Sequence, residues 1–120
     1  MKVAVLVVAV VVAPMAASAQ DWARIDARQA FLDRIGGQRL THRLYSISVN
    51  VTPGGQIAGD ALGWPVTGEW TWQDGWFCRT LFWGEDDLGY NCQMVEARGD
   101  ELRFTSDRGT GRSASLRLRP

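Results

Sequence analysis

The chain has few of the side chains on which most enzyme and metal chemistry depends. Its 120 residues include one histidine and two cysteines, and Lys2 is the single lysine. A zinc site needs three or four nitrogen or sulfur ligands, which this sequence does not supply once its cysteines pair. His42 has no serine, cysteine or acid in a recognisable catalytic relation to it. We therefore expect no catalytic residue, no metal site and no cofactor, and we lean against an enzyme.

The sequence also lacks an excess of charge of either sign. After residue 19 it has twelve arginines and thirteen acidic residues, a formal charge of −1. Nucleic-acid binding requires a strongly basic face, so this class of partner is excluded. The acidic run Glu85–Asp87, with Asn91 nearby, does not have the spacing of a known calcium loop, and we interpret it as a solvated hairpin tip.

The first nineteen residues have the organisation of an export signal. Lys2 is followed by the apolar stretch Val3 to Ala13, and Ala17-Ser18-Ala19 offers a small-residue cleavage site ahead of Gln20. The apolar stretch is too short for a membrane span. We predict a signal peptide over 1–19, no membrane span after its removal, and a periplasmic or secreted single β-rich domain over 20–120.

The run from Gly68 to Ala97 contains four of the six tryptophans and both cysteines. Strand-like segments are predicted at 66–72, 76–83 and 90–97. Asp74-Gly75 between the first two is a strong hairpin signal, because glycine adopts positive φ without penalty. The middle segment is apolar on both faces, which predicts a central strand covered on both sides. This run therefore predicts a three-stranded meander.

Cys78 and Cys92 lie on the second and third of these strands. Folding the hairpin about Glu85–Asp87 brings them together, although a symmetric turn leaves the register a few residues off. A bulge or a diagonal bridge would be needed. Two cysteines without a CxxC motif in an exported chain predict a structural disulfide, which would stabilise the fold by roughly 3 kcal/mol.

The rest of the chain predicts a helix and more short strands. Asp21 to Ile35 has one apolar stripe, with Asp26 as N-cap and Gly36-Gly37 as the stop. Gln38 to Val51 alternates like a strand but changes phase near Leu44, which suggests a bulge or bend. Gly59, Gly63 and Pro65 favour corners where a sheet coils or closes. We predict a small, mainly β antiparallel meander barrel or twisted sandwich of seven or eight strands, covered by the N-terminal helix.

Two sets of residues are candidates for binding. A core of this size cannot easily bury six indoles, and exposed aromatic side chains mark ligand or partner contacts. The candidate contacts are Trp22, Trp64, Trp70 and Trp72. The loop from Asp107 to Arg112 has the glycines and arginines of an anion cradle but not the following helix, so we expect a plain turn. Arg108 and Arg112 are the residues to test if an anion binds there.

Several segments resemble a family of short exported proteins from alphaproteobacteria. They include Gly54 to Gly59, the fairly specific Gly68 to Arg79, Asp87 to Gln93 and Phe104 to Gly109, and together they extend over most of the chain after the signal. Some members carry the label dihydrodipicolinate reductase. That activity implies a glycine-rich dinucleotide turn and a paired-histidine motif on a two-domain chain, and this sequence has none of them.

A looser similarity links the chain to small lipocalin-like barrels that inhibit secreted metalloproteases, through a glycine-x-tryptophan strand, one disulfide and export. It concerns architecture, and architecture does not fix function. We expect a module that binds a small apolar or anionic molecule or another envelope protein. An envelope enzyme, a secreted-protease inhibitor and a structural envelope component are the alternatives.

Overall fold

The computed structural model describes residues 2–13 and 21–120. The predicted cleavage site at Ala17-Ser18-Ala19, together with Gln20, lies outside the described residues. Residues 2–13 are exposed and belong to no helix or strand. The folded part begins at β1, and its elements are β1 (Ala23–Ile25), α1 (Arg28–Ile35), β2 (Arg39–His42), β3 (Ile47–Val51), β4 (Gln56–Ala61), β5 (Trp64–Gln73), β6 (Trp76–Trp83), β7 (Asp86–Arg98), β8 (Glu101–Thr105), α2 (Ser106–Gly109) and β9 (Ser113–Arg119).

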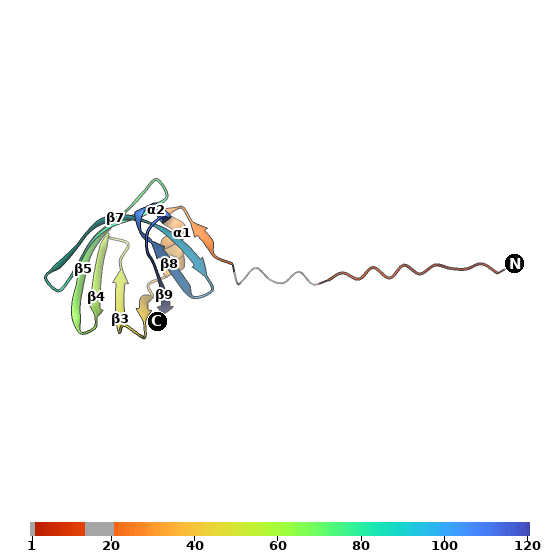
Figure 1. The fold of residues 1–120 in the computed structure, drawn as a ribbon, viewed down its shortest axis with the longest axis horizontal. Coiled ribbons are helices and arrows are strands. Elements are labelled where there is room, and N and C mark those ends of the chain that lie inside the picture. Colours follow the sequence, from red (N-terminus) through yellow and green to blue (C-terminus); the bar gives the residue numbers. More distant parts are fainter. Residues whose placement is uncertain (1, 14–20) are drawn as a thin grey trace.

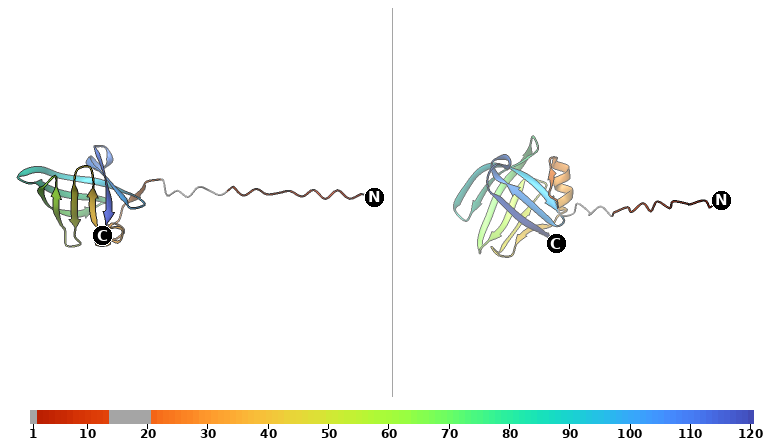
Figure 2. Two further views of the ribbon diagram at one scale, coloured as in Figure 1. Left: turned by 90° about the horizontal axis from the view of Figure 1, so that it is seen from below. Right: turned by 45° about the vertical axis from the view of Figure 1, so that its right-hand side comes forward.

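The strands from β2 to β9 form a closed eight-stranded antiparallel barrel. Each pairs with the next along the chain, and β9 returns to pair with β2 through Leu118 and Leu40. Figure 1 shows these strands curving around a common interior, and Figure 2 shows the same barrel from two further directions. The predicted meander is thus confirmed as a barrel. Closure also leaves few strand edges open to pairing with other molecules.

Two inward-facing glycines stand where neighbouring backbones approach most closely. A Cβ at Gly59 would lie 2.1 Å from the carbonyl oxygen of Ser48, and one at Gly68 would lie 2.1 Å from that of Thr80. Any larger residue would push the paired strands apart. Gly59 was one of the predicted corner residues, and the close approach explains why glycine is required there.

The helix α1 covers one end of the barrel. Its Phe31 is completely buried among the rings of Trp70, Trp72, Phe77 and Phe104, with centroid distances of 5.1 to 6.4 Å. The left-handed Gly36 ends the helix, as predicted. This aromatic cluster is the densest part of the core, and we refer to this end as the helix end.

The start of the predicted helix was wrong. Residues 23–25 form strand β1, because Ala23 to Ile25 pair with Val95 to Ala97 on the edge of β7 that β6 leaves free. The helix begins only at Arg28, with Ala27 rather than Asp26 at the N-cap and no side-chain cap. Pairing with a distant strand therefore overrides the local helical pattern.

Two strand predictions also need correction. The segment 38–51 is not one bent strand: a turn at residues 43–46 divides it into β2 and β3, at the predicted change of phase. β6 is not covered on both sides, because its outward-facing Phe82 is 40 % exposed. On this outer face Cys78 is buried, and it forms the disulfide with Cys92.

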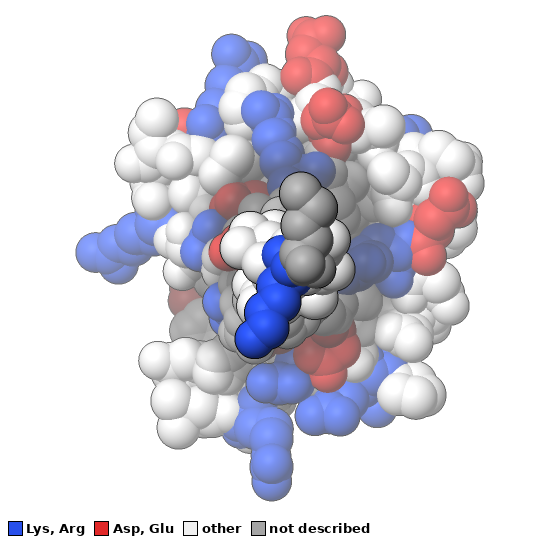
Figure 3. Space-filling view, turned by 90° about the vertical axis from the view of Figure 1, so that its right-hand side faces the viewer, with Lys and Arg blue, Asp and Glu red and all other residues white. Residues whose placement is uncertain are grey.

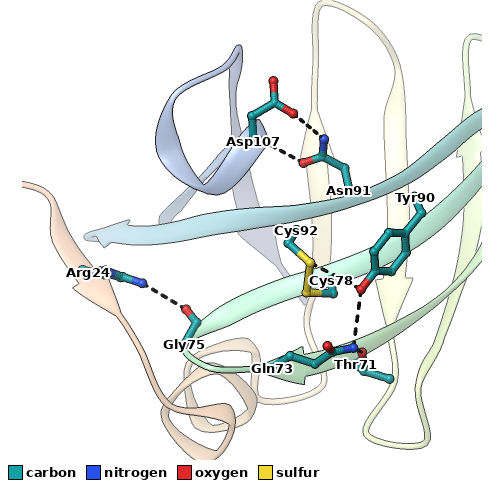
Figure 4. The surroundings of a disulfide bond; sticks show 9 residues. All are labelled: Arg24, Thr71, Gln73, Gly75, Cys78, Tyr90, Asn91, Cys92 and Asp107. Carbon is teal, nitrogen blue, oxygen red and sulfur yellow. Dashed lines mark hydrogen bonds between the residues drawn. A yellow bond between two sulfur atoms is a disulfide. The ribbon is translucent and has the colours of Figure 1, made fainter.

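The predicted disulfide is confirmed. Cys78 and Cys92 occupy directly paired positions on β6 and β7, and a bulge between Leu81 and Phe82 corrects the register, as expected. Figure 4 shows the bond on the outer face of the sheet, with the hydroxyl of Tyr90 3.4 Å from Cys92 Sγ. The bond therefore joins two neighbouring strands outside the barrel interior.

Candidate functional site

The barrel interior contains a cavity of about 460 Å³. This volume lies within the range of roughly 300 to 1,000 Å³ found for small-molecule sites, and eight-stranded barrels are just wide enough to hold one small ligand. All but two of the lining residues are aliphatic or aromatic; the exceptions are Arg79 and Gln93. The interior therefore combines an apolar wall with one cation and one amide.

The cavity reaches the surface at the end opposite α1. Tyr45, Leu62 and Leu88 line it and are 52 %, 53 % and 52 % exposed. They belong to the β2–β3 turn, the β4–β5 turn and the start of β7. In a meander every second connection lies at the same end of the barrel, so these three segments lie together. We call Tyr45, Leu62 and Leu88 the rim.

The β6–β7 bulge contributes to the rim. Leu81 pairs with Gly89 and Phe82 pairs with Asp87, so Leu88 is the extra residue, without a partner on β6. Trp83 lines the cavity just inside, and its Nε1 donates to the carbonyl oxygen of Ala61, 2.8 Å away. The indole is thereby fixed as part of the wall near the opening.

Arg79 is the charged group of the cavity. It faces inward from β6 between Phe77 and Leu81, and its Nη1 donates to the carbonyl oxygen of Gly89 at 2.9 Å. Its Nε is buried, and among the described residues this atom has no hydrogen-bond partner and the guanidinium forms no ion pair with a carboxylate. Burial away from water lowers the pKa of this guanidinium below its usual value.

The amide of Gln93 is the second polar group of the wall. It is nearly fully buried on β7, paired with Phe77 of β6, and its Nε2 donates to the hydroxyl of Ser106 at 3.1 Å. Two hydrogen bonds between Asn91 of β7 and Asp107 of α2 hold α2 against β7 (Figure 4). The Arg79 and Gln93 side chains therefore lie near each other on β6 and β7, with Gln93 oriented by α2.

Sequence reasoning did not single out Arg79 or Gln93 as site residues, although a signal was present. The inward face of β6 reads Phe77, Arg79, Leu81 and Trp83, so that one arginine interrupts an apolar row. A charged residue on an otherwise buried face is informative, because charged side chains are seldom buried without a partner.

The four candidate tryptophans do not form one site. Trp22 lies outside the barrel, where the guanidinium groups of Arg98 and Arg103 each lie 4.3 Å from its ring centroid. Trp64 is 61 % exposed and borders an outer hollow beside Trp83 and Gly84. This position places Trp64 next to the open end of the barrel.

Trp70 and Trp72 belong to the aromatic cluster at the helix end. Trp70 is 3 % exposed and donates from Nε1 to the carbonyl oxygen of Thr52, and Trp72 donates to that of Asp26. Neither lines the cavity. In the structure, both tie loops to the barrel, and contact of any of the four tryptophans with a ligand stays a prediction.

The arginine loop forms a tight turn. Asp107 and Arg108 both adopt left-handed backbone conformations, and Arg108 and Arg112 are exposed. Neither arginine side chain forms a hydrogen bond or ion pair with another described residue. Anion contact through these two residues is therefore also still a prediction.

His42 stands near the rim, and its ring lies 4.9 Å from that of Tyr45; its buried Nδ1 has no hydrogen-bond partner among the described residues. Within residues 2–13 and 21–120 there is no cluster of three or more acidic, histidine or cysteine side chains that could hold a metal ion. In the face shown in Figure 3, basic and acidic side chains are interspersed over most of the surface, and basic side chains gather along its lower edge.

Comparisons with known proteins do not assign this chain to a family. No protein-family model matches the chain, and no curated protein or solved structure gives a significant match. The resemblance to exported alphaproteobacterial proteins accordingly stays a prediction. None of the helices in the described residues is long and apolar enough to cross a membrane.

Proposed function

We propose that this chain is an exported binding module that holds one small apolar molecule inside its barrel. The observation that carries the proposal is the cavity of about 460 Å³, apolar except at two side chains and reaching solvent at an apolar rim. Each methylene group transferred from water into such a wall contributes about 0.8 kcal/mol, so a ligand of several carbons gains substantial affinity from burial alone.

Export is supported by the sequence of residues 1–19 and by the disulfide, since such bonds persist in oxidising compartments. An intact mass spectrum of unreduced protein isolated from its native envelope tests both points. The expected mass is that of the oxidised chain starting at Gln20. A retained signal sequence or free thiols would contradict this part of the proposal, and additional mass would reveal a retained ligand.

Binding is tested with N-phenyl-1-naphthylamine, a neutral apolar dye whose fluorescence rises when it leaves water. Titration of the dye with wild-type protein should give a saturable rise with one site per chain. No rise, or a rise that does not saturate, would refute binding in the barrel.

Matched variants on β4 locate the site. Ala61 lines the cavity, whereas Ala58, three residues earlier on the same strand, is exposed on the outer face. Ala61→Phe should fill the cavity near its opening and weaken dye binding at least tenfold, while Ala58→Phe should leave it unchanged. Circular dichroism checks that both variants fold, and equal binding by the two would place the dye elsewhere.

A further inference from the structure

The cavity contains a positive charge that the described protein does not neutralise. Arg79 projects into an apolar interior, has one hydrogen bond, to the Gly89 carbonyl oxygen, and has no carboxylate partner in the part of the chain that the structure describes. Its buried Nε donor is unsatisfied. Arg79 as a whole is half-buried, but a buried donor such as its Nε is unfavourable unless a partner is supplied, and here the space beside the group is the cavity itself.

We propose that the ligand is an apolar monocarboxylate, whose carboxylate binds Arg79 inside the barrel while its apolar part fills the cavity. This inference rests on the proposed function and names its ligand class. The free Nε and the remaining guanidinium donors form a planar fork that fits the two oxygens of a carboxylate. Gln93, beside Arg79 on the neighbouring strand, adds a polar edge to this part of the wall.

The charge count favours one negative charge over two. Among the residues lining the cavity, Arg79 is the single cation, and every other lining group except Gln93 is aliphatic or aromatic. A phosphate monoester would bring close to two negative charges and leave one of them without a partner in an apolar surrounding. A neutral ligand can accept a hydrogen bond from the Nε but leaves the positive charge of the guanidinium without a counter-charge.

The test compares ligands of equal chain length that differ only at the head group. Dodecanoate, dodecanol and dodecylamine are titrated at pH 7 against wild-type protein loaded with N-phenyl-1-naphthylamine, and displacement of the dye is measured. Dodecanoate should bind about ten- to a hundredfold more tightly than dodecanol, the range expected for one charge-assisted pair, and dodecylamine should bind most weakly. Equal affinities for dodecanoate and dodecanol would overturn the inference.

Variants then assign the preference to Arg79. Arg79→Met keeps the apolar stem and removes the charge, so the ratio of dodecanoate affinity to dodecanol affinity should fall to about one. Arg119→Met removes one exposed charge from the outer face and should retain the wild-type preference. Persistence of the preference in Arg79→Met would overturn the assignment. If Arg79→Met does not fold, Arg79→Gln takes its place with the same expected loss.

Failure of this inference is distinct from failure of the proposed function. If wild-type protein does not bind the neutral dye, the cavity is not a binding site, and the proposed function itself fails. If the dye binds but dodecanoate and dodecanol displace it equally well, the binding module stands and the monocarboxylate assignment is wrong.

Discussion

Replacement of Gly68 by alanine should destabilise the barrel far more than a glycine-to-alanine change normally does. The new Cβ would lie 2.1 Å from the Thr80 carbonyl oxygen, and since real contacts of this kind are essentially never below 3.0 Å, the backbones of β5 and β6 must separate by about 0.9 Å. Such overpacking typically costs about 1 to 3 kcal/mol. Alanine also lowers the conformational entropy of the unfolded chain, which stabilises the folded state by less than about 1 kcal/mol. We expect a net loss of about 2 kcal/mol in the free energy of unfolding.

The matched control is Gly54→Ala. Gly54 has no positive φ, and the atom nearest to the new Cβ would be Thr52 Oγ1 at 3.8 Å, which is an ordinary contact. This variant should be neutral or slightly stabilising. Urea titration measures both changes, and the Tm of Gly68→Ala should fall by roughly 10 °C. A loss below about 0.5 kcal/mol for Gly68→Ala, or equal values for both variants, would refute the argument from close approach.

Three further predictions follow from the disulfide, the helix end and the cavity wall. Replacing both Cys78 and Cys92 by alanine should lower the free energy of unfolding by about 3 kcal/mol without loss of dye binding, because the bond closes a short loop on the outer face; an unchanged urea midpoint would contradict this. Phe31→Ala should cost about 3 to 5 kcal/mol, since it empties the centre of the aromatic cluster, and a cost below about 1 kcal/mol would show that the cluster relaxes to fill the space. Trp83→Phe should remove most of the change in intrinsic fluorescence on dodecanol binding, whereas Trp64→Phe should retain it; the opposite result would place the ligand in the outer hollow.

The central meander could be predicted from sequence because its determinants are local. Asp74-Gly75 sets the β5–β6 turn, and both residues have positive φ there. The alternation of aromatic residues defines the faces of β5 and β6. The need to bring Cys78 and Cys92 together indicated the bulge in advance. Turn chemistry, side-chain period and one covalent constraint therefore gave the arrangement of β5 to β7.

The N-terminal segment and the site depended on contacts between distant parts of the chain. Residues 23–25 become a strand because Ala97 and its neighbours offer a free edge about 70 residues later, which no local pattern reveals. Whether Trp70 lines the cavity or packs in the core likewise depends on Phe31, because Phe31 packs against its ring. The sequence predicts that the interior is rich in aromatic residues, but it does not show which of them pack in the core and which line the cavity.

The distribution of side-chain size along the barrel explains why one half is filled and the other is hollow. At the helix end the inward positions carry Trp70, Phe77 and Phe104, and Phe31 fills the space between them. Towards the rim, the inward positions of β4 and β5 include Gly59 and Gly68, and Ala61 lines the wall.

The two glycines are required by the close approach of paired backbones, so the curvature that closes the barrel also removes side-chain volume from its interior. A cavity with this origin persists as long as the strands keep their curvature. For the same reason, Arg79 is held in an apolar space that its neighbours are too small to fill, and a bound carboxylate would satisfy it without any change in the fold.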